Sequence, residues 1–189
     1  FLPNIFLTTA LIFSSSAGIY GNPESLPIKE EDSKTPLNPY GETKYIIEKM
    51  LEWYDQAYGL KFMAIRYFNA AGAALDGSIG EDHPDESHLI PLIIKAGLKS
   101  EKFVIYGNDY KTNDGTCIRD YIHVLDLVET HEIALKKLLG GSESNYYNAG
   151  VGRGYSNNEV VETVRKVTGL KINVEYGSRR EGDADSLYA

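Results

Sequence analysis

A tyrosine and a lysine stand four positions apart in the stretch NPYGETK, residues 38–44. At 3.6 residues per turn, Tyr40 and Lys44 would lie on one face of a helix, one above the other. An ammonium group beside a phenol favours loss of the phenolic proton, because it stabilises the phenolate. The same spacing is also typical of an ordinary surface pair at a helix start, so other residues must decide between the two interpretations.

A run of serines, FSSSAGIYG, ends an apolar segment upstream of this pair. A hydride that leaves a carbinol carbon requires removal of the hydroxyl proton at the same time, and a phenolate can accept that proton. A serine hydroxyl beside the phenolate can hydrogen-bond the same oxygen. Together, Ser16, Tyr40 and Lys44 therefore indicate hydride chemistry with a nicotinamide dinucleotide.

The elements that would position these residues alternate between strand-like and helix-like segments. Apolar runs predict strands over residues 9–15, 61–68, 102–107, 144–150 and, as the final strand, 171–177. Amphipathic patterns predict helices over residues 40–59, 89–99, 124–141 and 156–169. This alternation predicts an α/β fold with a parallel sheet. Trp53 is expected on the apolar side of its helix, and Cys117 as a small packed side chain.

Three glycines in GVGRG, residues 150–154, resemble a dinucleotide-binding loop in front of a helix. The third glycine is misplaced for G-x-G-x-x-G, and no acidic residue closes a second strand beyond it. Ser156 and Glu159 form an S-x-x-E capping box, which explains the start of the helix without a ligand. A helix cap is therefore predicted here.

The composition, with 42% hydrophobic and 24% charged residues and a net charge of -8, is that of a globular protein without a nucleic-acid-binding surface. A single cysteine excludes an internal disulfide and favours the cytoplasm. No apolar run reaches the ~18 residues of a membrane span, and no membrane partner is expected. Because the sequence opens at Phe1 without a basic leader, it is interpreted as an internal piece of a longer protein.

The histidines are spread over the chain, at His83, His88, His123 and His131. They share no metal-ligand spacing, so no metal is implied. The acidic residues between 81 and 86 are most simply a solvated loop.

Eight segments resemble, in order and at fitting spacings, the nucleotide-sugar epimerases of the extended short-chain dehydrogenase/reductase family. They are FSSSAGIYG, PYGETK, IRYFNAAGA, GEDH, HLIP, IYGNDYKTNDGTCIRDYIHVLDL, YYNAGVGRGYS and RREGD. They cover nearly the whole chain, and the GNDY–DGT–RDYIHV–DL stretch is highly specific.

The resemblance implies the distal half of a Rossmann-like parallel sheet with a smaller α/β substrate-binding domain. Residues 1–69 would belong to the NAD-binding domain and residues 70–189 to the substrate-binding part, with about 120–150 packing back on the former. The implied reaction interconverts UDP-glucose and UDP-galactose by NAD-dependent oxidation and re-reduction at sugar C4, in galactose metabolism. A cytoplasmic homodimer is implied, as is inactivity of these 189 residues alone.

The resemblance also assigns roles to single residues. Tyr40 corresponds to the catalytic base, Ser16 to its hydroxyl partner, and Lys44 to the residue that bonds the nicotinamide ribose. Phe68 would lie beside the cofactor.

The substrate site would take residues from several segments. Asn69, Arg119 and Arg180 would contact the UDP diphosphate, since the arginine fork suits phosphate oxygens. His88 and Leu89 occupy a contact pair that is Asn-Leu in some members, so the backbone contact is the firmer expectation for His88. The uracil site would be lined by Val104, Ile105 and Tyr106. Asp183 would pair with a ribose hydroxyl.

Leu187 falls at the position that gates the sugar pocket in this family, where tyrosine admits plain hexoses and cysteine admits N-acetylated ones. Leucine would leave room for part of an acetamido group, which would extend the substrates to UDP-N-acetylhexosamines. In the competing interpretation Leu187 only packs and Tyr188 closes the pocket.

Two other interpretations stay open. A nucleotide-sugar dehydratase or decarboxylase would share the oxidation step, but dehydratases carry an Asp-Glu pair after the active-site hydroxyl residue, where this chain has Ala17 and Gly18. A non-catalytic fragment that binds at most a nucleotide would fit the missing glycine-rich phosphate loop.

Overall fold

The computed structural model describes residues 10–189 of the chain. Thr9, the first residue of the predicted strand 9–15, lies outside the described residues. The elements follow in the order β1 (Ala10–Ser16), a 3-10 turn (Ala17–Tyr20), α1 (Pro39–Tyr58), β2 (Lys61–Tyr67), β3 (Asn69–Ala71), α2 (Leu89–Lys99), β4 (Lys102–Tyr106), β5 (Ile118–Arg119), β6 (Tyr121–His123), α3 (Val124–Leu139), β7 (Asn145–Ala149), β8 (Tyr155–Ser156), α4 (Asn157–Thr168), β9 (Asn173–Gly177) and β10 (Ser186–Leu187).

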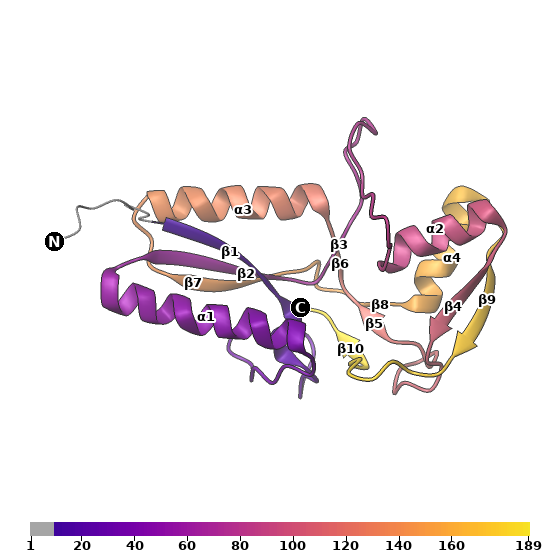
Figure 1. Ribbon diagram of the computed structural model, residues 1–189, viewed down its shortest axis with the longest axis horizontal. Coiled ribbons are helices and arrows are strands. Elements are labelled where there is room, and N and C mark those ends of the chain that lie inside the picture. The colour runs from indigo at the N-terminus through magenta and orange to yellow at the C-terminus, as the bar shows by residue number, and fades with distance from the viewer. Residues whose placement is uncertain (1–9) are drawn as a thin grey trace.

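The first group of elements is a parallel sheet of order β1-β2-β7, with α1 on one face and α3 on the other (Figure 1). Its strands are apolar because both faces are covered, and Met63, Ile65 and Ala64 are almost fully buried. The register pairs Ser16 with Tyr67 and Tyr67 with Ala149. The carboxyl ends of all three strands therefore meet at one edge, as the predicted α/β fold requires.

Helix α1 has clear signals at both ends. The Asn38 side chain accepts a hydrogen bond from the Gly41 N–H, Pro39 opens the first turn, and Gly59 ends the helix in the left-handed region at φ 71°. Trp53 lies among apolar residues of α1, but that side of the helix faces away from the sheet, and Trp53 is 65% exposed. Leu51 lies on the buried side of α1. Trp53 is two residues further along, so its side chain points about 200° around the helix axis from that of Leu51, away from the buried side.

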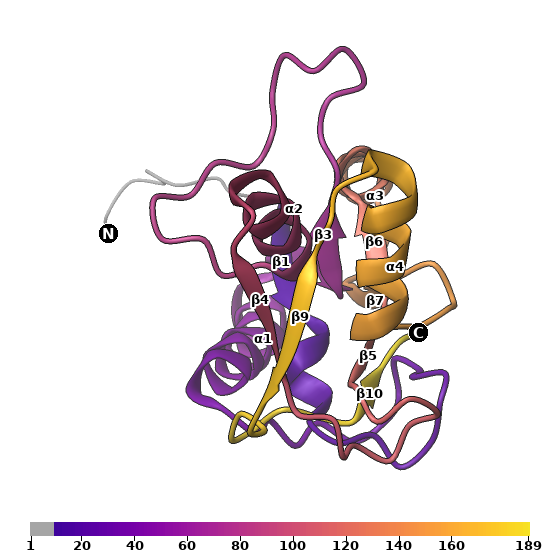
Figure 2. The ribbon, with the colours of Figure 1, turned by 90° about the vertical axis from the view of Figure 1, so that its right-hand side faces the viewer.

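In the second group of elements, α2 and α4 pack against the parallel strand pair β4–β9 (Figure 2). Its core gathers Ile93 of α2, Ile105 of β4 and Val161 of α4, each at most 1% exposed. The Ser156 hydroxyl accepts the Glu159 N–H, and the Glu159 carboxylate accepts the Ser156 N–H. The predicted capping box before α4 is confirmed.

Very short strands connect these two groups of elements. β3 pairs with β6, and β5 pairs with both β8 and β10. The prediction that residues 171–177 form the last strand is wrong, because β10 follows and pairs in parallel with β5. Strands of two or three residues are too short to show the alternation of apolar and polar residues that marks a strand in the sequence. They form because a partner strand distant in the chain supplies the hydrogen bonds. Among residues 10–189, no helix has the length and apolar character needed to cross a membrane.

Candidate active site

A cavity of about 720 Å³ opens at the carboxyl edge of the β1-β2-β7 sheet. Its lining includes Ser16 from β1, Tyr40 from α1, and Phe68 and Asn69 after β2. His88, at the far end of the loop 72–88, lines it too. Clefts at this edge of parallel sheets are where α/β proteins bind ligands.

Tyr40 and Lys44 lie one turn apart at the start of α1, as predicted. Lys44 Nζ donates a 2.8 Å hydrogen bond to the Ser14 carbonyl and lies 5.6 Å from the centroid of the Tyr40 ring. Tyr40 is 54% exposed, so its phenol can reach a ligand in the cavity. Burial and the nearby Tyr40 raise the pKa of Tyr67, which lines the same cavity.

Ser16 is held beside α1 by a close backbone contact. Its side chain accepts a 3.1 Å hydrogen bond from the Gly18 N–H and caps the turn 17–20. A Cβ on Gly41 would meet the Gly18 carbonyl oxygen at 2.5 Å. Only glycine at position 41 therefore allows the end of β1 to approach the first turn of α1 this closely, which sets Ser16 near Tyr40.

Asn69 connects this cavity to a neighbouring one of about 510 Å³, which Leu89 also lines. The Asn69 backbone and side-chain N–H groups both donate to the Asp120 carbonyl, at 3.0 Å each. Burial raises the pKa of the Asp120 carboxyl, whose oxygens accept the Val151 N–H. Asn69 thus has a fixed position at the boundary of the two cavities.

A third cavity, of about 610 Å³, gathers part of the predicted uracil and diphosphate site. Val104, Tyr106 and Arg180 line it together with residues 84–87. The Arg180 guanidinium lies 4.2 Å from the centroid of the Tyr106 ring, a cation–π contact. Ile105 points the other way into the core, so any ligand contact it makes comes from its backbone.

Neither Arg119 nor Asp183 lines any of the three cavities described above. Arg119 is 3.8 Å from the Asp183 carboxylate and donates to the Ile118 carbonyl. Leu187 pairs with Arg119 across β10 and β5 and packs against the cluster that contains Phe68. The structure therefore brings Ser16, Tyr40, Lys44, Phe68, Asn69, His88 and Leu89 together and sets the nucleotide residues apart in two further groups.

A buried polar network behind Ser16 was missed by the sequence analysis. Arg66 Nε and Nη2 donate to the Glu48 carboxylate at 3.0 and 2.8 Å, and the Ser15 hydroxyl donates to it at 2.6 Å. Arg66 also donates to the Tyr20 hydroxyl, and burial raises the Tyr20 pKa to about 12. An arginine inside the apolar strand KFMAIRYF was the signal, because it requires a buried acidic partner.

The remaining histidines outside the loop have structural roles. His131 Nε2 lies 2.9 Å from the Ser14 hydroxyl, and His123 accepts the Leu125 N–H at the start of α3. Cys117 is buried, as predicted, and burial raises the pKa of its thiol.

Residues 6–150 match the NAD dependent epimerase/dehydratase family. The UDP-glucose 4-epimerase of Lactobacillus helveticus is 52% identical over 180 residues, which cover 95% of this chain and 54% of that protein. The crystal structure of UDP-glucose 4-epimerase from Brucella ovis in complex with NAD superimposes with a TM-score of 0.91 at 48% identity, covering 96% of this chain and 56% of that one.

The corresponding enzyme from Bifidobacterium longum, in complex with NAD+ and UDP, has a TM-score of 0.87 and 37% identity, over 96% of this chain and 55% of that one. The chain spans about half the length of the curated relatives it matches. These likenesses confirm the predicted Rossmann-like α/β fold. The chain belongs to the NAD dependent epimerase/dehydratase family.

Proposed function

We propose that these residues are the catalytic and substrate-binding part of a UDP-glucose 4-epimerase, which interconverts UDP-glucose and UDP-galactose. The observation that carries the proposal is the placement of Tyr40, Ser16 and Asn69 around one cavity, with Lys44 beneath the tyrosine ring. The likeness to epimerases at about 50% identity supports the same reaction.

The site fits the nicotinamide end of NAD. Within residues 10–189, Lys44 makes one hydrogen bond, to the Ser14 carbonyl, so other ammonium protons could be donated to a ribose hydroxyl. Ser16, Tyr40, Lys44 and Phe68 would hold the cofactor at the carboxyl edge of the sheet. The bound cofactor would supply the hydride acceptor for oxidation at sugar C4 and the hydride donor for re-reduction from the opposite face.

The residues of the chain supply the proton transfer. Tyr40 takes the proton of the sugar 4-hydroxyl and gives it back, and Ser16 hydrogen-bonds the same oxygen. Lys44 places its positive charge one helical turn away, 5.6 Å from the centroid of the Tyr40 ring, where it would stabilise negative charge on the reacting oxygens.

The nucleotide stays anchored while the sugar turns. Arg119 and Arg180 would pair with the diphosphate and Asn69 would donate to it, while Val104, Ile105 and Tyr106 would surround the uracil. Asp183 would accept a ribose hydroxyl. Arg119 and Arg180 sit in separate groups, so a bound diphosphate would have to bridge them.

Ala17 and Gly18 weigh against a dehydratase. Neither residue has an acid or base, and both directly follow Ser16 at the cavity. Loss of water from the oxidised sugar requires such groups. Re-reduction, and therefore epimerisation, is the reaction that these side chains support.

We also propose the domain division and a cytoplasmic homodimer. Residues up to 69, with about 120–150, would form part of the NAD-binding domain, because α3 and β7 pack on β1 and β2. An exposed apolar face on α1 would meet a second copy of the chain. It comprises Ile46, Ile47, Met50, Trp53 and Tyr54.

An assay of the full-length polypeptide with UDP-galactose and NAD tests the function. We expect formation of UDP-glucose without net loss of NAD. A polypeptide limited to these 189 residues is the comparison, and we expect it to be inactive and to aggregate, since β1 is an open edge of the sheet. Failure of the full-length polypeptide to convert the sugar, or turnover by the 189 residues alone, would contradict the proposal.

Leu187→Tyr tests the proposed sugar gate. We expect the parent protein to accept UDP-N-acetylglucosamine beside UDP-glucose and the tyrosine variant to lose the acetylated sugar only, because the larger ring fills the space. Leu187 packs beside Phe68, which lines the catalytic cavity. Relative kcat/KM for the two sugars is the measurement, and an unchanged ratio in the variant shows that Leu187 only packs.

A further inference from the structure

The loop before α2 brings two histidines and two glutamates to one place. The coordinating atoms of Glu81, His83, Glu86 and His88 all lie within 4.8 Å of one another. His83 Nδ1 is 3.3 Å from Glu81 Oε1 and 3.6 Å from Glu86 Oε2. His88 Nδ1 is 3.5 Å from Glu86 Oε1 and contacts Glu81 Oε1 as well. The loop is largely exposed, as expected for a solvated loop, and its fold brings these side chains together without a regular spacing in the sequence.

The separations suit a tetrahedral ion. With metal–ligand distances of about 2.0–2.1 Å, neighbouring donor atoms in such a site lie about 3.3–3.4 Å apart. Three of the imidazole–carboxylate separations, 3.3, 3.5 and 3.6 Å, are close to this value, and they involve both Glu86 oxygens. His88 contacts Glu81 directly, and a bound ion would have to replace that contact. Imidazole nitrogens with carboxylate oxygens are a ligand set of zinc, and four donors complete its coordination.

The backbone of the loop fixes the Glu86 carboxylate. Glu86 Oε1 accepts the Ser87 N–H at 2.7 Å and the His88 N–H at 2.8 Å. The Glu86 side chain is 6% exposed, whereas the imidazoles of His83 and His88 are about half exposed. An ion can therefore reach the site from the solvent side, where the Glu86 carboxylate is already held in place.

We propose that Glu81, His83, Glu86 and His88 bind one divalent transition-metal ion of the zinc class. Glu81 and His88 also line the cavity that holds Tyr40 and Ser16. A bound ion would therefore hold the loop in its present shape at the rim of that cavity. The competing explanation is a set of histidine–glutamate ion pairs that needs no metal.

Binding of Co²⁺ to the full-length polypeptide, after chelation and dialysis, tests the site. Tetrahedral Co²⁺ absorbs strongly in the visible range, and octahedral surface binding does not. We expect one Co²⁺ per chain, a visible band, and displacement of the Co²⁺ by Zn²⁺. His83→Ala and His88→Ala are each expected to weaken binding by at least about tenfold.

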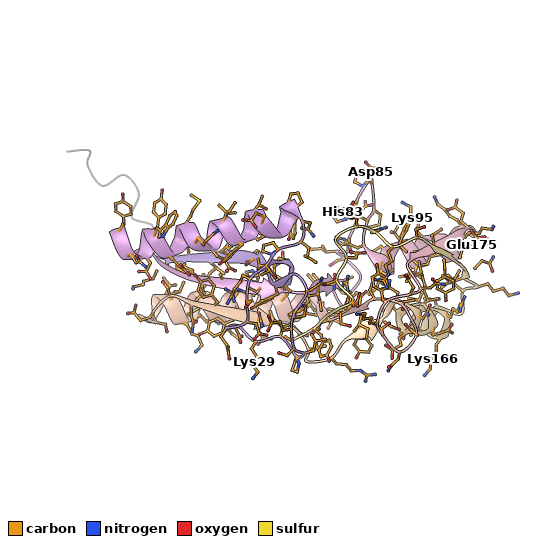
Figure 3. All side chains as sticks on the ribbon, turned by 90° about the horizontal axis from the view of Figure 1, so that it is seen from below. Lys29, His83, Asp85, Lys95, Lys166 and Glu175 are labelled. Carbon is orange, nitrogen blue, oxygen red and sulfur yellow. The ribbon has the colours of Figure 1, made fainter. Side chains whose placement is uncertain are left out.

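Asp82→Asn and Asp85→Asn are the matched controls, since each removes one negative charge from the same loop. Asp85 lies at the outer end of the loop (Figure 3), and neither residue belongs to the cluster. Both controls should bind Co²⁺ like the parent, and circular dichroism should show every variant folded. The proposal is overturned if no visible band forms, if the band survives in His83→Ala and His88→Ala, or if the controls lose it equally. Because the readout is metal binding, the result is independent of epimerase activity.

Discussion

Replacement of Tyr40 by phenylalanine is expected to lower the epimerisation rate of the full-length polypeptide by about 10²–10⁴-fold, the range typical of a positioned acid–base group. The phenylalanine ring keeps the shape of the side chain in the cavity but has no oxygen to carry the proton. UDP binding should be nearly unchanged, because the proposed anchors are Arg119 and Arg180. The measurement is kcat with UDP-galactose beside the Kd of UDP from calorimetry.

Tyr58→Phe is the control for this change. Tyr58 is the last residue of the same helix and is 79% exposed, so its variant also loses one phenol oxygen from α1. Parental activity is expected for it. Activity of Tyr40→Phe within a factor of three of the parent would remove Tyr40 from the mechanism, and a parallel loss of UDP affinity would point to a misfolded site.

Much of the catalytic edge could be predicted because it depends on local signals. The Tyr-x-x-x-Lys pair lies on a helix whose start is capped by Asn38 and whose end is capped by Gly59. The serines end an apolar run, so the chain order alone brings Ser16 to the carboxyl edge of a parallel sheet. Helix periodicity, caps and short apolar strands are properties of neighbouring residues, and a single sequence contains them.

The parts that could not be predicted depend on contacts that no regular spacing in the sequence marks. β10 exists because Leu187 lies beside Arg119. The apolar side of α1 that carries Trp53 is exposed, whereas the buried Glu48 and Leu51 occupy the face toward the sheet, and the helix pattern alone does not show which side packs. The donor atoms of His83 and His88 converge through loop folding rather than through a regular spacing.

The Glu48–Arg66 pair shows why a charged residue can lie on an inner face. Glu48 is one turn beyond Lys44 on α1, and Arg66 is in the central strand β2. Arg66 is 2% exposed and Glu48 1% exposed. Ser15, next to Ser16, donates to the same carboxylate. The pair therefore connects the helix that carries Tyr40 to the strand that carries Ser16.

Arg66→Met is expected to lower the free energy of unfolding by about 3–5 kcal/mol, because it leaves the Glu48 carboxylate buried without its cation. Glu48→Leu should cost a similar amount, because the Arg66 guanidinium would lose its carboxylate and keep, among residues 10–189, the neutral Tyr20 hydroxyl and Glu30 carbonyl as hydrogen-bond acceptors. Urea denaturation of the full-length polypeptide, followed by circular dichroism, measures both changes.

The double variant Glu48→Leu/Arg66→Met separates the loss of a pair from the loss of packing. With both charges removed, no buried ion remains, so its destabilisation should be smaller than the sum of the two single effects. Lys136→Met is the exposed control: it breaks the 2.5 Å bridge to Glu132 on α3, where both side chains are more than half exposed. That change should cost at most about 0.5 kcal/mol. If Arg66→Met costs no more than Lys136→Met, or if the single effects simply add in the double variant, the buried pair does not hold α1 to the sheet.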